Sequence, residues 1–96
     1  MIEVSRFHVK GHLSVDEFLA ANDRFQRDFA YRQKGLVRRT VARGADGAWL
    51  SLTVWRSMRH VEDASLAAET SPVALEFTDF IDPLASVTEY FDELPG

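Results

Sequence analysis

Tryptophan and hydroxyl side chains alternate with aliphatic ones along residues 49–55, and this stretch is the best suited in the chain to hold an aromatic ligand. Trp49, Ser51, Thr53 and Trp55 share one parity, so a strand would place all four on one face of a sheet. An indole offers a large apolar face to a planar ring, and a hydroxyl can bond to a ligand carbonyl or phenol. The alternative is that the indoles fill a core or a subunit interface and that the hydroxyls bond locally.

The opposite parity of this stretch is purely aliphatic, with Leu50, Leu52 and Val54. We expect this aliphatic face to pack against helices and the aromatic-and-hydroxyl face to lie open in a monomer. An open aromatic patch needs a ligand or a partner. The aromatic-and-hydroxyl face is therefore expected to line a cavity or a subunit interface.

Histidine exchanges protons most readily near neutral pH, and the chain contains His8, His12 and His60. None has a second ligand at the spacing of a convincing metal site, so we expect no bound metal. His8, in the first expected strand, and His60, shortly after Trp55, are the candidate catalytic bases. For each, the alternative is a ring that faces solvent or is bonded locally.

Three further polar residues are candidate ligand-binding groups. Asn22 interrupts the apolar stripe of the first expected helix, and a buried amide must find a hydrogen-bond partner. The alternative for Asn22 is a structural amide at a seam between helix and sheet. Arg38 and its neighbour Arg39 could attract an anionic substrate such as a carboxylate or phenolate, although charged residues also protect edge strands from unwanted pairing.

The composition excludes several classes of function. The 96 residues carry a net charge of −4, which argues against general nucleic-acid binding, and no apolar run approaches the length of a membrane span. The chain has no cysteine, which excludes disulfides and a thiolate nucleophile. No phosphate-binding loop or dinucleotide motif is present. We expect a cytoplasmic protein that binds neither nucleic acid nor membrane and uses no cofactor.

The order of the expected elements predicts the fold. Periodicity predicts strands at 2–10, 36–43, 49–55 and 85–93, a helix at about 15–31, and a second helix after Ser57 that breaks and restarts at Ser71-Pro72. This β-α-β-β-α-β order, in one domain over residues 1–96, is typical of the ferredoxin-like α+β sandwich. Its four-stranded antiparallel sheet has the spatial order 4-1-3-2 and carries the helices on one face. The uncovered face predicts a homodimer in which two sheets close a barrel.

The whole chain resembles the dimeric α+β barrel proteins and, within them, the antibiotic biosynthesis monooxygenase-like group. The resemblance is carried by Gly35-Leu36, Asp46-Gly47, Trp55-Arg56-Ser57 and Ser71-Pro72. It implies a small-molecule-binding homodimer similar to cofactor-independent monooxygenases, with a small aromatic or polyketide-like compound as substrate. The alternative is a ligand-binding or dimerisation protein of the same fold without catalysis.

The resemblance also implies that Trp55 is the tryptophan of a catalytic site. The oxygenases of this group have an asparagine four residues before that tryptophan and a tyrosine six residues after it, where this chain has Ser51 and Val61. A cavity lined by Trp55, Ser51 and Thr53 would favour ligand binding. Side chains that interdigitate without a void would favour a role in dimerisation alone.

Overall fold

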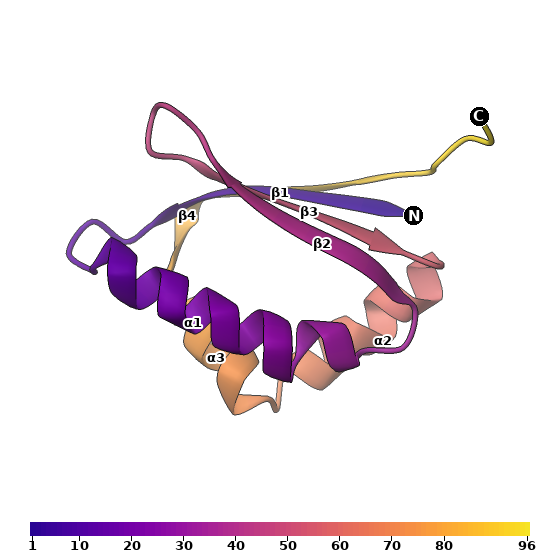
Figure 1. Ribbon diagram of the computed structural model, residues 1–96, viewed down its shortest axis with the longest axis horizontal. Coiled ribbons are helices and arrows are strands. Elements are labelled where there is room, and N and C mark those ends of the chain that lie inside the picture. The colour runs from indigo at the N-terminus through magenta and orange to yellow at the C-terminus, as the bar shows by residue number, and fades with distance from the viewer.

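The computed structural model describes residues 1–96 and has one four-stranded sheet with all of its helices on one side (Figure 1). The strands are β1 (Ile2–Val9), β2 (Leu36–Arg43), β3 (Trp49–Trp55) and β4 (Ile81–Phe91). The helices are α1 (Val15–Asp28), the short 3-10 helix η1 (Ala30–Arg32), α2 (Met58–Ala68) and α3 (Pro72–Asp79). All strand pairs are antiparallel and the order is β2-β3-β1-β4. This is the predicted ferredoxin-like fold with the predicted strand order.

Three serines start the three α-helices, as their positions in the sequence predict. The hydroxyl oxygens of Ser14, Ser57 and Ser71 accept hydrogen bonds from the backbone N–H groups three residues further on. Each bond satisfies one of the N–H groups that a helix leaves unpaired at its start. Pro72 follows its cap at the first helical position, where no N–H is needed.

The last strand begins four residues earlier than the sequence indicates. Asp82-Pro83 suggests an end to the preceding helix, but α3 ends at Asp79 and β4 already starts at Ile81, which pairs with Val9. Proline is tolerated here because β4 is an edge strand and needs no donor on its outer side. The first strand is irregular near its end, since the β1–β4 register shifts between Phe7 and Val9, which indicates a bulge.

The assignment of the two faces of β3 from sequence is wrong. Trp49, Thr53 and Trp55 lie against the helices with 6%, 5% and 7% of their surfaces exposed, whereas Leu50, on the outer face, is 37% exposed. The Trp49 ring lies 4.9 Å from that of Phe18 on α1, between ring centroids. Each indole has a large apolar surface to bury, and Phe7, which pairs with Trp49, adds a third buried aromatic ring to the same face. The face that carries the indoles therefore takes the helices.

The buried side chains form two separate clusters between the sheet and the helices. The larger cluster consists of four aromatic residues, Phe7, Phe18, Trp49 and Phe77. The smaller cluster joins Trp55 at the end of β3 to Val61 and Ala64 of α2. The helices lie along one side of the sheet and leave its other side bare (Figure 1).

Candidate functional site

A half-open cavity of about 200 Å³ lies between the sheet and the helices. Its sheet side carries Ser51, Thr53 and Trp55 of β3, together with Glu3 of β1 and Arg39 of β2. Its helix side is mostly apolar and comes from α1, α2 and α3. The cavity therefore brings two opposite charges and several hydroxyls into an otherwise apolar space, as in binding sites for small molecules.

Glu3, Thr53 and Arg39, on the sheet side of the cavity, belong to one row that crosses all four strands. In the register of the sheet, Tyr90 pairs with Glu3, Glu3 with Thr53, and Thr53 with Arg39. Directly paired residues point to the same face. Because neighbouring strands lie about 4.8 Å apart, the backbones at Glu3 and Arg39 are separated by roughly 10 Å. The row therefore has a carboxylate and a guanidinium on either side of a central hydroxyl.

Arg39 is held in place from three directions. Its Nη1 donates to Asn22 Oδ1 at 2.9 Å and to Gln26 Oε1 at 3.0 Å, both on α1. Its backbone N–H donates to the hydroxyl of Tyr31, which donates in turn to the Arg39 carbonyl oxygen. Its guanidinium carbon lies 4.9 Å from the ring centroid of Phe25, a favourable cation–π arrangement. These contacts orient the guanidinium without neutralising its charge.

Burial lowers the pKa of Arg39 to about 10, because removal from water disfavours the charged form. Tyr31 and Glu3 oppose this shift only in part. No carboxylate lies within ion-pair distance of Arg39, although six ion pairs form elsewhere on the protein. At neutral pH the cavity therefore contains an arginine that is charged and lacks a counter-ion.

Glu3 links the cavity to Trp55 and to the last strand. Its Oε1 accepts a hydrogen bond from Trp55 Nε1–H at 3.0 Å, and its Oε2 accepts one from the Tyr90 hydroxyl at 3.3 Å. The carboxylate fixes the orientation of the indole, and burial with the nearby Glu3 charge raises the pKa of Tyr90. Trp55 thus presents a ring of fixed orientation to the cavity.

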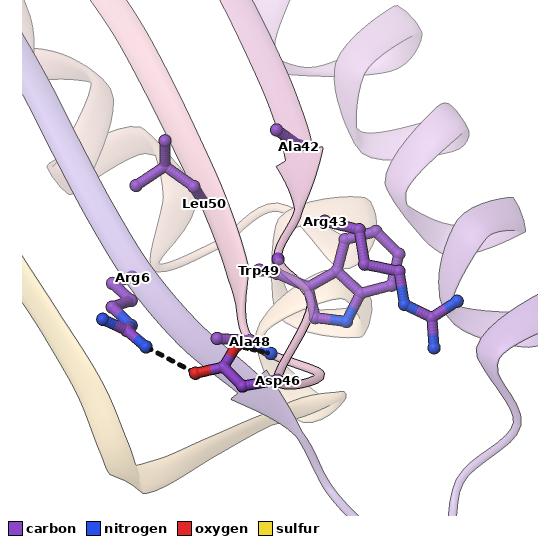
Figure 2. Close-up of a pocket in the computed structure, with 8 residues that line it drawn as sticks. Arg6, Ala42, Arg43, Asp46, Ala48, Trp49 and Leu50 are labelled. Atoms are coloured by element: carbon purple, nitrogen blue, oxygen red, sulfur yellow. Dashed lines mark hydrogen bonds and ion pairs between the residues drawn. The ribbon is translucent and has the colours of Figure 1, made fainter.

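A second hollow of about 330 Å³ lies at the β2–β3 hairpin and is more open to solvent (Figure 2). Arg6 and Asp46 on its rim form an ion pair of 2.8 Å and are both largely exposed. Arg43 lies over the ring of Trp49, 5.2 Å from its centroid. Arg6 and Asp46 offset each other's charge, and Arg43 is exposed to water, so this hollow offers a ligand less than the cavity does.

Solved structures of other proteins share this architecture. SnoaB from Streptomyces nogalater, a cofactor-independent oxygenase, matches in a mutant form with 25% identity over 99% of this chain and 93% of that chain, at a TM-score of 0.77. A Caulobacter crescentus CB15 protein described as a candidate antibiotic biosynthesis monooxygenase matches with 15% identity over 98% of this chain and 89% of that chain, at a TM-score of 0.75. No protein-family model and no curated protein matches the sequence.

The chain has the antibiotic biosynthesis monooxygenase-like fold. No helix of the chain is both long and apolar enough to cross a membrane. No group of three or more His, Cys, Asp or Glu side chains is arranged to hold a metal ion.

The structure brings four of the predicted site residues together. Trp55, Ser51 and Thr53 line the cavity. Asn22 does not line it, but its side-chain oxygen accepts the hydrogen bond from Arg39. The desolvation cost expected for the Asn22 amide is thus offset by a charged donor.

The other four predicted residues lie away from the cavity. Trp49 belongs to the aromatic cluster, and Arg38 is exposed on the outer face, paired with Val54. His8 is half-buried beside the β1 bulge and lines no part of the cavity. His60 Nδ1 lies 2.8 Å from the Ser57 hydroxyl oxygen, and its ring packs on Gly35.

Of the two arginines that the sequence offers for anion binding, Arg39 lines the cavity and Arg38 does not, and the charged residue missed from the sequence is Glu3. Arg39 shares its parity with Val41, which is half-buried in the core, and Glu3 shares its parity with the buried Phe7. A charged residue on the apolar parity of a strand was therefore the available signal. In β2 this signal does not distinguish Arg39 from Arg38. The two arginines are adjacent and occupy both parities, which is typical of a solvated edge strand.

Proposed function

We propose that this chain is a small-molecule-binding homodimer that oxygenates a small aromatic compound without a cofactor. The observation that carries the proposal is the cavity, in which Trp55, Ser51 and Thr53 meet the charges of Glu3 and Arg39. The likeness to SnoaB, a cofactor-independent oxygenase, supports the same function.

The residues of the cavity suit the oxidation of a phenol by molecular oxygen. Glu3 is positioned to accept the proton of a ring hydroxyl, and Arg39 and Thr53 to stabilise the resulting oxyanion. The substrate anion then supplies the electrons itself. For a naphthol, one atom of O2 becomes the second carbonyl oxygen of a naphthoquinone, and the other leaves as water with two hydrogens from the substrate.

The size of the cavity limits the substrate. Its volume of about 200 Å³ lies below the roughly 300–1,000 Å³ of pockets for larger ligands. A compound of one or two rings therefore fits better than an extended polyketide.

Binding without catalysis is the second candidate function, and one observation favours it. Neither His8 nor His60 lines the cavity, and both oxygens of Glu3 already accept hydrogen bonds. A base in this state is less free to take a proton from a substrate. In this case the cavity would bind its ligand without altering it.

The outer face of the sheet supports the proposal of a homodimer. Ile2, Val4, Leu52 and Val54 lie on it in two adjacent pairs, and Leu50 follows. No element of the chain covers this aliphatic surface (Figure 1). A second sheet of the same kind would bury it.

The oxygenase proposal is tested by oxygen consumption with 1-naphthol and by the Trp55→Phe variant. We expect one O2 consumed per naphthoquinone formed, and a rate at least ten-fold lower in the variant, because phenylalanine cannot donate the hydrogen bond to Glu3. An unchanged melting temperature would show that the variant is folded. If 1-naphthol binds but no oxygen is consumed, the cavity is a binding site without this activity.

A further inference from the structure

Arg39 is the only charged residue among the buried ones, with 8% of its surface exposed, and no carboxylate pairs with it. We propose that the cavity is selective for a small aromatic carboxylate, whose two oxygens bind the Nε and Nη2 edge of Arg39. This inference rests on the proposed role of the cavity in binding a small molecule, and it names the class of ligand.

The contacts of Arg39 leave one edge of the guanidinium free. The two hydrogens of Nη1 are used by Asn22 and Gln26. Nε and Nη2 have no partner within the protein, yet no buried side-chain nitrogen or oxygen is left unpaired. These two nitrogens therefore face open space, and the open space that Arg39 lines is the cavity. Two parallel N–H donors on one edge match the two oxygens of a carboxylate.

The surroundings of Arg39 leave its charge to be balanced by a ligand. The rings of Phe25 and Phe77 lie 4.9 and 5.3 Å from the guanidinium carbon and stabilise the cation only partly. Glu3 lies two strands away, and both of its oxygens are bonded to other groups. A buried charge without a partner is costly, so an anion that completes the pair gains both attraction and directed hydrogen bonds.

The rest of the cavity favours a flat apolar group on that anion. Phe25, Phe77, Ala74 and Leu36 line it, as does the indole of Trp55. The volume of about 200 Å³ fits one or two rings. An aliphatic acid would meet the same guanidinium but would lose the contacts between rings.

The test compares benzoate with benzamide, which has the same ring and nearly the same shape but no charge. Binding is measured for the intact protein by titration calorimetry and by the shift of the Trp55 Nε1–H resonance. We expect benzoate to bind at least ten-fold more tightly than benzamide, since a charge-assisted pair of hydrogen bonds replaces a neutral one. This comparison needs no variant.

Two substitutions on adjacent residues then locate the effect. Arg39→Gln removes the charge inside the cavity, and Arg38→Gln removes a charge on the outer face of the same strand. We expect R39Q to weaken benzoate binding at least ten-fold and benzamide binding less than two-fold, and R38Q to change neither. Thermal melting establishes that both variants are folded.

The possible results separate this inference from the proposed function. Benzamide that binds wild-type protein as well as benzoate does would overturn the carboxylate selectivity and leave the small-molecule cavity intact. Loss of benzoate binding in R38Q but not in R39Q would likewise overturn it. Failure of both compounds to bind at millimolar concentration would contradict the small-molecule role of the cavity itself.

Discussion

Glu3 and Arg39 act on a ligand in opposite directions. They lie in one row on the sheet side of the cavity, with Thr53 between them. A ligand anion on Arg39 is attracted by the guanidinium and repelled by the carboxylate across the row. At a separation of about 10 Å and an effective dielectric constant near 20, that repulsion amounts to roughly 1 kcal/mol after screening.

Glu3→Gln is therefore expected to tighten benzoate binding by about five-fold. The amide oxygen of glutamine can still accept the hydrogen bond from Trp55 Nε1–H, so the indole should keep its orientation. The measurement is titration calorimetry, with Glu89→Gln on the outer face of β4 as the control of equal charge change. Equal affinities in the wild type and in Glu3→Gln would show that Glu3 does not face the bound anion.

The pH dependence of anion binding follows from the lowered pKa of Arg39, about 10. The guanidinium is charged below this pH, so benzoate affinity should be constant from pH 7 to 9 and fall as pH rises through about 10. Benzoate itself stays ionised throughout. Tyr90 lies in the same row of the sheet as Arg39, and measurements on the R39Q variant show whether the loss of affinity depends on Arg39. A persistent affinity in wild-type protein at pH 11 would contradict the prediction.

The same pKa shift links Arg39 to stability with a defined sign. The folded pKa is lower than that of the unfolded chain, so above about pH 10 the unfolded state binds more protons than the folded state. Below about pH 10 Arg39 is charged in both states, and burying this charge lowers the free energy of unfolding by its full amount. As pH rises above about 10, the folded state loses the proton and this cost disappears. Arg39 thus contributes ligand binding at the expense of stability.

At the scale of elements, the junction between η1 and β2 depends on one glycine. Gly35 has a φ of +82°, and a β-carbon there would overlap the imidazole ring of His60. The ring of His60 is held in turn by the hydroxyl of Ser57, the cap of α2. This contact joins the start of β2 to the start of α2, and it gives His60 a structural role in the packing.

Gly35→Ala is expected to destabilise the protein more than Gly47→Ala. Both glycines have a positive φ, +82° and +83°, but a β-carbon at Gly47 would meet nothing within 4 Å. The hairpin variant should cost about 1 kcal/mol for its backbone strain, and Gly35→Ala roughly 2 kcal/mol more because the ring must also move. Urea unfolding measures both. Adding His60→Ala to Gly35→Ala should recover the excess, and no recovery would exclude the ring as its cause.

At the scale of the whole molecule, the outer face of the sheet sets the expected assembly. Leu52 lies at its centre, between Val4 on β1 and Thr40 on β2. A sheet covered on one side only leaves such residues in contact with water, unless a second sheet packs on them. The dimer is therefore expected to form through the aliphatic face. The sequence had suggested the opposite face, which carries the tryptophans.

Leu52→Asp should convert the dimer into a folded monomer of 10.9 kDa. A charge buried in the interface without a partner would raise the dissociation constant roughly 100-fold or more. Sedimentation velocity at micromolar concentration measures the change, and circular dichroism checks the fold. The control is Leu66→Asp on α2, where the leucine is already 68% exposed. Wild-type protein that sediments as a monomer would contradict the proposed assembly.

Local sequence signals predict the helices and strands and their order. Ser14, Ser57 and Ser71 start helices, and Gly35 and Gly47 adopt the positive φ that their turns require. These signals are local, because a cap or a turn depends on residues that are neighbours in the chain. The element order then left one compact arrangement, the ferredoxin-like sandwich.

Contacts between distant segments determine which face of the sheet the helices cover and which residues line the cavity. Alternation in β3 defines two faces without saying which is inside, and the burial of Trp49 and Trp55 settled that choice. Glu3 and Arg39 lie 36 positions apart in the chain and meet through the register of three strands. Register and burial depend on contacts between distant segments. The cavity and its uncompensated arginine therefore emerge only when the chain folds.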